Sequence, residues 1–194
     1  TYDMGMVPNE SHNQLSDFIK GNRHFYDRTK TTATIVKNLY KTIQNAVGDA
    51  EVIGCNTFGH LVAGIHSAQR VGNDTSGRSF EWTRKQGVNS MMRLPQNETF
   101  FNVDPDCAAF TEKVDPDLNL DFLEVCAITG MTTLASVTPG ILTDEQISRI
   151  NKIFKMADQN NLRYTIKYVD KNSNPDTFVG ENDEKQYDWY KGYD

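Results

Sequence analysis

The chain has 194 residues, which fits one domain or part of a larger one, and 38% of them are hydrophobic, enough to supply a core. Charged residues make up 24% and the formal net charge is −6, so the chain as a whole is no obvious binder of nucleic acid or of anionic membranes. It contains no apolar run of about 18 residues, so we expect no transmembrane helix. Enzymatic, binding and structural roles all stay open.

Helical and extended patterns alternate along the chain. In chain order we expect a loop over residues 1–27, a helix over 36–47, a strand over 51–55, a helix over 58–66, a strand that leads into Arg70, a helix over 78–86, a strand over 99–103, a helix over 116–129, a strand over 131–137, a helix over 144–157 and a strand over 163–170.

The ends of several helices are marked clearly. Asp115-Pro116 places a capping residue before a proline at the first helical position. Thr143 to Gln146 matches a capping box. Three glycines, Gly48, Gly87 and Gly130, are expected to end the helices that precede them.

Strands that alternate with helices predict βα units and a parallel sheet. We count four such units between about residues 50 and 158. A closed (β/α)8 barrel of the TIM type needs about 250 residues, so four units correspond to half of one. The sequence therefore predicts an α/β fold, with a partial (β/α)8 barrel over residues 1–158 and a linker with the start of a β segment over 159–194.

Polar residues follow the predicted strands. In barrels of this kind functional groups lie at the carboxyl ends of the strands, and Asn56, Arg70, Asp74 and Asp104 all fall there if the strands form as predicted. An amide, a guanidinium and two carboxylates on one rim suit a ligand made of hydroxyls, because charged groups bind sugars through paired hydrogen bonds.

Asp74 is the candidate acid/base. Glycoside cleavage needs two carboxyl groups, one as acid and then base, the other as nucleophile or base. The acid has to be protonated at working pH, so its pKa must be raised by burial or by a nearby carboxylate. Direct contact with Arg70 would lower that pKa, so we assign Arg70 to sugar hydroxyls or to shielding between two carboxylates.

Each of these residues also has a structural interpretation. Asp74 lies within Asn-Asp-Thr-Ser-Gly, which is a good turn sequence. Asp104-Pro105-Asp106 suits a turn at a strand end equally well. Asn56 could simply form a hydrogen bond with the backbone and have no role in binding. Local sequence leaves both interpretations open.

Other side chains point to no metal or cofactor. No histidine pair has the spacing of metal ligands, and no phosphate- or dinucleotide-binding motif occurs. Cys55, Cys107 and Cys126 lie in apolar segments without a CxxC motif, which is typical of small buried side chains. Trp82 and Trp189 could stack on sugar rings, although isolated tryptophans more often pack in a core.

The order and spacing of three motifs carry a family resemblance. Ile53-Gly54-Cys55-Asn56, Arg70-x-x-x-Asp74 and Asp104-Pro105-Asp106 together resemble the second half of the catalytic barrel of melibiase-type α-galactosidases, a family of retaining glycoside hydrolases. Residues 122–136 resemble part of the last helix–strand–helix of that barrel. The likeness covers about residues 1–158.

The resemblance implies a role for each motif. It makes Asp74 the acid/base and Arg70 a ligand of the terminal sugar. It places Cys55 and Asn56 in the strand-five segment that contacts the 2-position of the sugar, and Asp104 in the substrate-binding motif of strand seven. It further implies the C-terminal half of the barrel, hydrolysis of terminal α-galactosyl or related sugars from an oligosaccharide or glycoside, and no cofactor.

The chain departs from the family pattern in two places. The family nucleophile lies in a Lys-x-Asp tripeptide at the end of strand four, and Thr1-Tyr2-Asp3 resembles the residues just after it. We therefore expect the nucleophile and the first four strands to lie outside this chain. Asn56 stands where the family often has a glutamate or a small residue, so N-acetylgalactosamine, β-L-arabinopyranose or transfer to another sugar stay as alternatives to galactose hydrolysis.

These departures set the expectations for the isolated chain. A half barrel exposes sheet edges, so we expect it to be inactive alone and to associate with its missing half or with another copy. The alternative function is a non-catalytic carbohydrate-binding or structural protein on a degenerate barrel. The compartment stays open, with a secreted or periplasmic location as an expectation for the intact parent protein.

Overall fold

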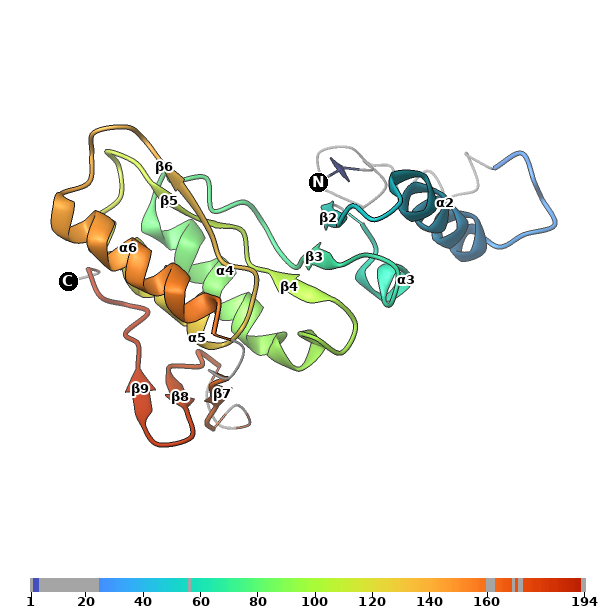
Figure 1. Cartoon of the computed structure of the whole chain (residues 1–194). Helices are drawn as coiled ribbons and strands as arrows, with labels where there is room; N and C mark the ends of the chain where they lie inside the picture. The colour runs from blue at the N-terminus through green and yellow to red at the C-terminus, as the bar shows by residue number, and fades with distance from the viewer. Residues whose placement is uncertain are drawn as a thin grey trace. The chain divides into compact units, whose positions relative to one another are not determined.

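The computed structural model describes residues 2–3, 25–55, 57–159, 163–168, 170 and 173–192. Within these residues the chain is a mixed α/β protein with five α-helices and several small sheets, which confirms the predicted α/β class (Figure 1). Its contacts divide it into two compact units. The N-terminal unit comprises residues 1–70 and 98–102, and the C-terminal unit comprises residues 71–97 and 103–194.

The N-terminal unit contains a small parallel sheet. Its elements are β1 (Tyr2–Asp3), α2 (Thr32–Val47), β2 (Ile53–Cys55), α3 (Gly59–Val62) and β3 (Ala68–Arg70). β1 pairs with β2 and β2 pairs with β3, both in parallel. Asn102 extends the sheet, because its N–H donates to the carbonyl of Ser67 at 2.9 Å. The strands of this unit thus lie in chain order.

Helix α2 forms where the apolar spacing predicts it. The side chain of Thr31 caps its start by accepting from the N–H of Thr34 at 3.2 Å, and Gly48 ends it with a φ of 62°. Val36 and Tyr40 are buried on its inner face. The first part of the predicted apolar stripe is thus buried, whereas Val47 at its end is exposed.

Polar side chains fill the space beneath β2. A Cβ on Gly54 would lie 2.4 Å from Oε1 of Gln69 and 2.8 Å from Oγ1 of Thr57, and the Thr57 hydroxyl donates to that Gln69 oxygen. The buried ring of His66 lies 5.6 Å from the ring of Tyr40, centroid to centroid. Only glycine leaves enough room at position 54 for this polar layer.

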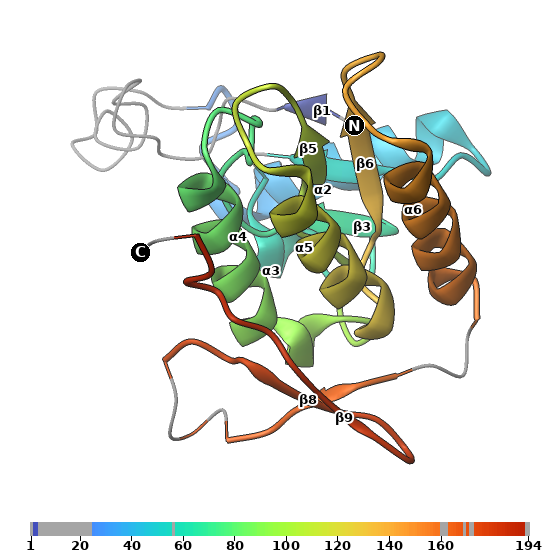
Figure 2. The same cartoon turned by 90° about the vertical axis from the view of Figure 1, so that its left-hand side faces the viewer.

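The C-terminal unit combines three long helices with two small sheets. Its elements are α4 (Phe80–Met92), a 3-10 turn η1 (Leu94–Gln96), the end of β4 (Asn102–Asp104), β5 (Cys107–Phe110), α5 (Pro116–Ile128), β6 (Leu134–Val137), α6 (Asp144–Ala157), β7 (Thr165–Ile166), β8 (Thr177–Val179) and β9 (Glu184–Gln186). β5 and β6 pair in parallel, and β7, β8 and β9 pair in antiparallel order. Helices α4, α5 and α6 lie side by side, with α5 in the middle (Figure 2).

The predicted starts of α5 and α6 are confirmed. Asp115 accepts from the N–H of Asp117 at 3.0 Å, with Pro116 at the first helical position. Thr143 and Gln146 form a reciprocal capping box with bonds of 3.1 and 3.2 Å. Short side chains that satisfy the first free N–H groups set these boundaries.

Helix α4 does not end at Gly87, as the sequence analysis predicts, but continues to Met92. Gly87 is buried, and a Cβ there would lie 2.6 Å from Cζ3 of Trp189 and 3.2 Å from Cε2 of Phe122. This glycine therefore makes room for an indole from the end of the chain. A packing requirement, which local sequence does not reveal, accounts for the wrong helix end.

Several strands also differ from the prediction. Among the described residues, the strand expected over 163–170 is reduced to the two residues of β7, and Tyr168 takes a φ of 59°, which lies outside the strand region. The helix expected over 58–66 is shorter in the structure, where it comprises only α3. Strand β5 and the hairpin of β8 and β9 were not predicted. Cys-Ala-Ala-Phe in β5 lacks alternation, and β9 is short and largely polar.

The segment after β9 packs against α4 and α5. Trp189 is only 4% exposed, and its Nε1 donates to the carbonyl of Pro175 at 2.6 Å. This confirms the packing interpretation of that tryptophan. Trp189 is therefore part of the core of the C-terminal unit.

Replacement of Gly87 by alanine should destabilise the protein. Alanine normally favours a helix interior by about 1 kcal/mol over glycine, but here its methyl group would overlap a rigid buried indole. We expect a net loss of about 1–2 kcal/mol in the free energy of unfolding, measured by urea denaturation. Gly59→Ala is the control, because its nearest neighbour is Cζ of Phe101 at 3.8 Å. Equal stability of Gly87→Ala and the unaltered protein would contradict this packing argument.

Candidate functional site

The structure describes four of the five predicted site residues. Cys55 and Arg70 are the last residues of β2 and β3 in the N-terminal unit, and both are partly exposed. Asp74 and Asp104 belong to the C-terminal unit. Asn56 lies outside the described residues. Each described candidate therefore lies at the carboxyl end of a strand or in the loop that follows one.

Asp74 lies in an open hollow of the C-terminal unit. The hollow has a volume of about 420 Å³ and is lined by Asn73, Asp74, Ser76, Arg78 and Trp82. It brings together a carboxylate, a guanidinium and an indole, and its size falls within the range of small-molecule sites. Trp82 is 46% exposed, so one part of its indole is open to a ligand.

Arg78 does not figure among the predicted site residues, and Trp82 does so only as one of two tryptophans that could stack. Asp74, Arg78 and Trp82 follow one another at intervals of four residues, which would place them on one face of a helix. The structure does not bear out this pattern, because only Trp82 is helical and Arg78 precedes the start of α4. The shared hollow follows from the path of the loop.

Hydrogen bonds made by Thr75, the residue after Asp74, hold the Asp74 loop in place. Thr75 is fully buried, and its N–H donates to Oδ2 of Asp106 at 2.7 Å. Its hydroxyl donates to the carbonyl of Cys107 at 2.7 Å. With Thr75 anchored in this way, the preceding residue Asp74 is left exposed at the surface.

The Asp-Pro-Asp motif is a turn between β4 and β5. Asp106 takes a φ of 72°, its N–H donates to Oδ1 of Asp104 at 2.8 Å, and its own Oδ1 accepts from the N–H of Cys107 at 2.7 Å. The structural interpretation of this motif is therefore confirmed. Asp104 is 1% exposed. Burial raises the pKa of the Cys126 thiol, and the charge of Asp104 adds to this effect. Its role in substrate binding stays a prediction.

The Asp74 loop is also tied at both of its ends. The side-chain amide of Asn89 on α4 donates to the carbonyl of Val71 at 2.8 Å, and a Cβ on Gly72 would overlap Oε1 of Gln86. At the other end, the hydroxyl of Thr111 donates to the carbonyl of Gly77. These contacts come from α4 and from the segment after β5, so the loop has a defined conformation.

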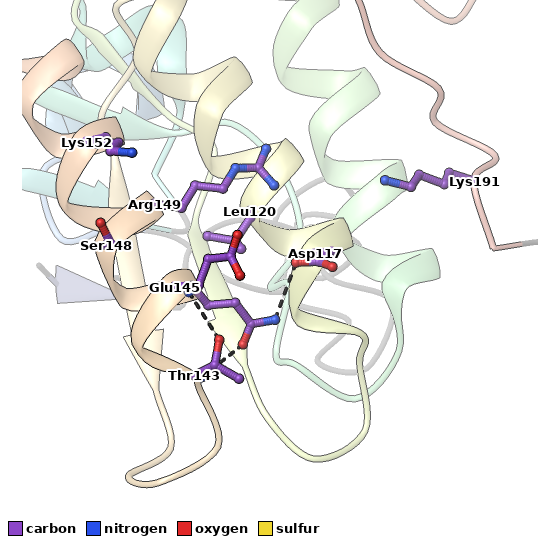
Figure 3. A pocket seen from close by; sticks show the side chains of 9 residues that line it. Asp117, Leu120, Thr143, Glu145, Ser148, Arg149, Lys152 and Lys191 are labelled. Carbon is purple, nitrogen blue, oxygen red and sulfur yellow. Dashed lines mark hydrogen bonds between the residues drawn. The ribbon is translucent and has the colours of Figure 1, made fainter.

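A second hollow, of about 530 Å³, lies between α5 and α6 (Figure 3). A cluster of charged residues joins α5, α6, β9 and the segment after β9, and its members are Asp121, Glu124, Arg149, Lys185 and Lys191. Two of them, Arg149 and Lys191, also line this hollow. Arg149 donates to Asp121 at 2.7 Å and to Glu124 at 3.1 Å. Lys185 bonds to Glu124 at 2.9 Å, and Lys191 to Asp121 at 3.0 Å. Each acid of the cluster is paired with two cations, so we regard the cluster as structural.

Glu124 is the least exposed acid of this charge cluster. Burial alone would raise its pKa, but hydrogen bonds from Lys185 and Arg149 outweigh burial and leave the pKa below its usual value. The pKa of Arg149 is raised, since its bonds to the two carboxylates outweigh its own burial. The folded state therefore stabilises the charged forms of both partners.

The described part of the chain offers little for other chemistry. No group of three or more His, Cys, Asp or Glu side chains within it could hold a metal ion. None of the helices described is long and apolar enough to cross a membrane. The three cysteines are free thiols; Cys126 is buried as expected, while Cys55 and Cys107 are partly exposed.

One Lys-x-Asp tripeptide, the motif of the family nucleophile, does occur in the chain, at Lys113-Val114-Asp115. Its aspartate caps α5 and accepts from the N–H of Asp117. It lies in the loop that joins β5 to α5 and not at the end of a strand, where the family nucleophile lies. This tripeptide is therefore a helix start.

The chain matches no model of a known protein family and no curated protein sequence. The resemblance to α-galactosidases thus depends on the residues of the chain itself.

Thr75→Val should loosen the Asp74 loop. The valine keeps the shape of the side chain but loses the hydrogen bond to the Cys107 carbonyl. A buried hydrogen bond contributes about 1 kcal/mol, so we expect amide hydrogen exchange in residues 73–78 to become roughly five- to tenfold faster. Thr75→Ser, which retains the hydroxyl, should exchange like the unaltered protein. Similar rates in the valine and serine variants would exclude this bond as the anchor.

Acid should remove the contribution of Glu124 to stability. Because its folded pKa is lowered, this contribution is complete above the ordinary glutamate pKa and is lost as pH falls through the lowered value. We expect Glu124→Gln to cost about 1 kcal/mol near pH 7, and the cost to shrink below about pH 4. Urea denaturation at several pH values measures it. Glu112→Gln, at an exposed site, controls for the loss of one carboxylate, and a cost that did not vary with pH would contradict the assignment.

Proposed function

We propose that this chain is part of a retaining, α-galactosidase-like glycoside hydrolase that releases terminal α-galactosyl or related sugars. The observation that carries the proposal is the position of Asp74. It is exposed in an open hollow beside Arg78 and Trp82, on a loop that buried hydrogen bonds of Thr75 hold in place. A fixed carboxylate next to a hydrogen-bonding cation and an open indole suits a sugar ligand.

We further infer that the chain is the C-terminal half of a (β/α)8 barrel. Three features support this inference. The strands β1, β2 and β3 are parallel and lie in chain order. β5 and β6 are parallel as well. A helix follows β2, β3, β5 and β6, as the repeated βα unit of a barrel requires.

The reaction would follow the retaining route. A carboxylate outside this chain attacks the anomeric carbon, the bond to the leaving oxygen breaks, and Asp74 gives its proton to that oxygen. Asp74 then removes a proton from water, and the water oxygen displaces the carboxylate from the anomeric carbon. In the intact enzyme the two carboxyl groups should lie about 5–5.5 Å apart.

The remaining candidates would hold the terminal sugar. We assign Arg70 and Asp104 to its hydroxyl groups, and Cys55 with Asn56 to the segment near its 2-position. Galactose is the expected sugar, with N-acetylgalactosamine and β-L-arabinopyranose as alternatives that the residue at position 56 leaves open.

A non-catalytic carbohydrate-binding protein on a degenerate barrel is the second candidate. One observation favours it: Asp74 is the only carboxylate among the described residues that line the hollow. Such a protein would bind the same sugars without cleaving them. The two candidate functions therefore both predict that the protein binds these sugars, but only the hydrolase is expected to cleave them.

An external nucleophile separates the two candidates. Azide can replace a missing carboxylate by attacking the anomeric carbon and forming a β-galactosyl azide. We expect the chain to release no phenol from phenyl α-galactoside alone, and to release it when azide is added. Asp74→Asn should slow this azide reaction by about 100-fold or more, because phenol leaves poorly without a proton donor.

Two controls make this test specific. With 4-nitrophenyl α-galactoside, whose leaving group needs no proton, Asp74→Asn should change the rate much less. Asp49→Asn removes an exposed carboxylate after α2 and should leave both rates unchanged. Sugar binding without azide-dependent release would favour the non-catalytic candidate, and the absence of both would refute the two proposals.

A further inference from the structure

A third hollow, of about 400 Å³, lies beside the hairpin of β8 and β9 in the C-terminal unit. Its wall comes from the segment before β8 and from the end of β9 with the residues that follow. Two carboxylates, Asp176 and Asp188, and the rings of Tyr187 and Tyr190 line it, and none of the described residues in this wall is a lysine or an arginine. We call it the hairpin hollow. The proposed hydrolysis makes no use of it.

The two carboxylates of the hairpin hollow are not neutralised within the described part of the chain. The hydroxyl of Thr177 donates to Oδ1 of Asp176 at 2.9 Å, and the N–H of Tyr190 donates to Oδ1 of Asp188 at 2.9 Å. No described lysine or arginine forms an ion pair with either acid. Two negative charges in the wall of one hollow attract a cation from outside.

Tyr190 adds an aromatic surface to these charges. It is 51% exposed, and its hydroxyl accepts from the side-chain amide of Asn174 at 2.9 Å. Cζ of Arg84 lies 4.8 Å from the centre of its ring, whereas Arg84 itself does not line the hairpin hollow and donates to Glu81 at 2.9 and 3.0 Å. A tyrosine ring attracts a cation, and a planar guanidinium also stacks on it. The fold therefore already contains one pairing of a guanidinium with this ring.

Buried contacts hold the wall of the hairpin hollow in a defined conformation. Nε1 of Trp189 donates to the carbonyl of Pro175 at 2.6 Å, and the N–H of Tyr187 donates to the carbonyl of Asp176 at 2.8 Å. The ring of Tyr187 packs edge-on against the fully buried ring of Phe178, with 5.4 Å between the centroids. The two segments that form the hollow are thus joined to each other, and a ligand would meet a wall that needs little ordering.

We propose that the hairpin hollow binds an arginine side chain from a basic segment of a partner protein. The guanidinium donates to the carboxylates of Asp176 and Asp188 and lies against the ring of Tyr190. Arginine fits better than lysine, because its planar group forms paired hydrogen bonds with a carboxylate and stacks on an aromatic ring. The net charge of −6 draws a basic partner toward the chain. This inference does not depend on the proposed hydrolase activity.

A ligand series on the unaltered chain tests the recognition of the guanidinium. The ligands are N-acetyl-arginine amide, its neutral isostere N-acetyl-citrulline amide, and N-acetyl-lysine amide. In ¹H–¹⁵N NMR spectra we expect the arginine derivative, at millimolar concentrations, to shift the amide signals of residues 186–190 and the indole signal of Trp189, which Trp82→Phe distinguishes from that of Trp82. The citrulline derivative should shift neither, and the lysine derivative should bind about threefold to tenfold more weakly.

Variants locate the bound cation. Asp176→Asn combined with Asp188→Asn removes both charges and keeps the oxygens that accept from Thr177 and Tyr190. We expect this double variant to bind the arginine derivative about tenfold more weakly, and Tyr190→Leu to bind it about threefold more weakly. Glu181→Gln is the matched control, because Glu181 is an exposed acid between β8 and β9 that does not line the hollow, and it should bind normally.

Several outcomes would overturn this inference. Equal binding of the citrulline derivative would show that charge is not recognised, and equal binding of the lysine derivative would exclude a guanidinium site. Unchanged affinity in the double variant, or shifts confined to Trp82, would place the cation elsewhere. The absence of any shift with the arginine derivative would refute the site itself. The proposed function is tested separately, because the double variant should retain the azide-dependent reaction that depends on Asp74.

Discussion

The hydrogen bonds of Thr75 are the constraint on which the candidate site depends. One buried threonine joins the loop after β3 to the turn between β4 and β5, through Asp106 and Cys107. Because the N–H and the hydroxyl of Thr75 point inward, Asp74 is left facing solvent. The Asp-Pro-Asp turn therefore contributes indirectly: its second aspartate, Asp106, supports the neighbour of the proposed acid/base. Supporting hydrogen bonds of this kind hold a functional group in a defined geometry.

A second constraint comes from the far end of the chain. Trp189 fills the space that Gly87 leaves on α4, and the charge cluster of Asp121, Glu124, Arg149, Lys185 and Lys191 ties the same segment to α5 and α6. Helix α4 is the element that carries Trp82 and that anchors the Asp74 loop through Asn89. Packing by the C-terminal segment therefore bears on the hollow without touching a ligand. Loss of that packing would affect stability and the site together.

Short sequence patterns predicted the helix starts, which depend on hydrogen bonds between residues close together in the chain. Asp115-Pro116 and the Thr143–Gln146 capping box satisfy free N–H groups within one helical turn, so the starts of α5 and α6 follow from sequence. Gly87 is different, because its reason lies in an indole about a hundred residues away in the chain. The partnership of Thr75 with Asp106 is equally non-local. Asp74 could be picked out from its motif, whereas the hollow it shares with Arg78 and Trp82 emerges only from the folded loop.

The exposure of Asp74 bears on what the intact site must contain. In the proposed reaction Asp74 acts together with a second carboxyl group, and Asp74 is the only carboxylate among the described residues that line the hollow. The proposed hydrolase therefore requires a further segment that brings a second carboxyl group toward Asp74. A binding protein has no such requirement, because one carboxylate is enough to accept hydrogen bonds from sugar hydroxyls. The need for a second carboxyl group thus separates the two candidate functions.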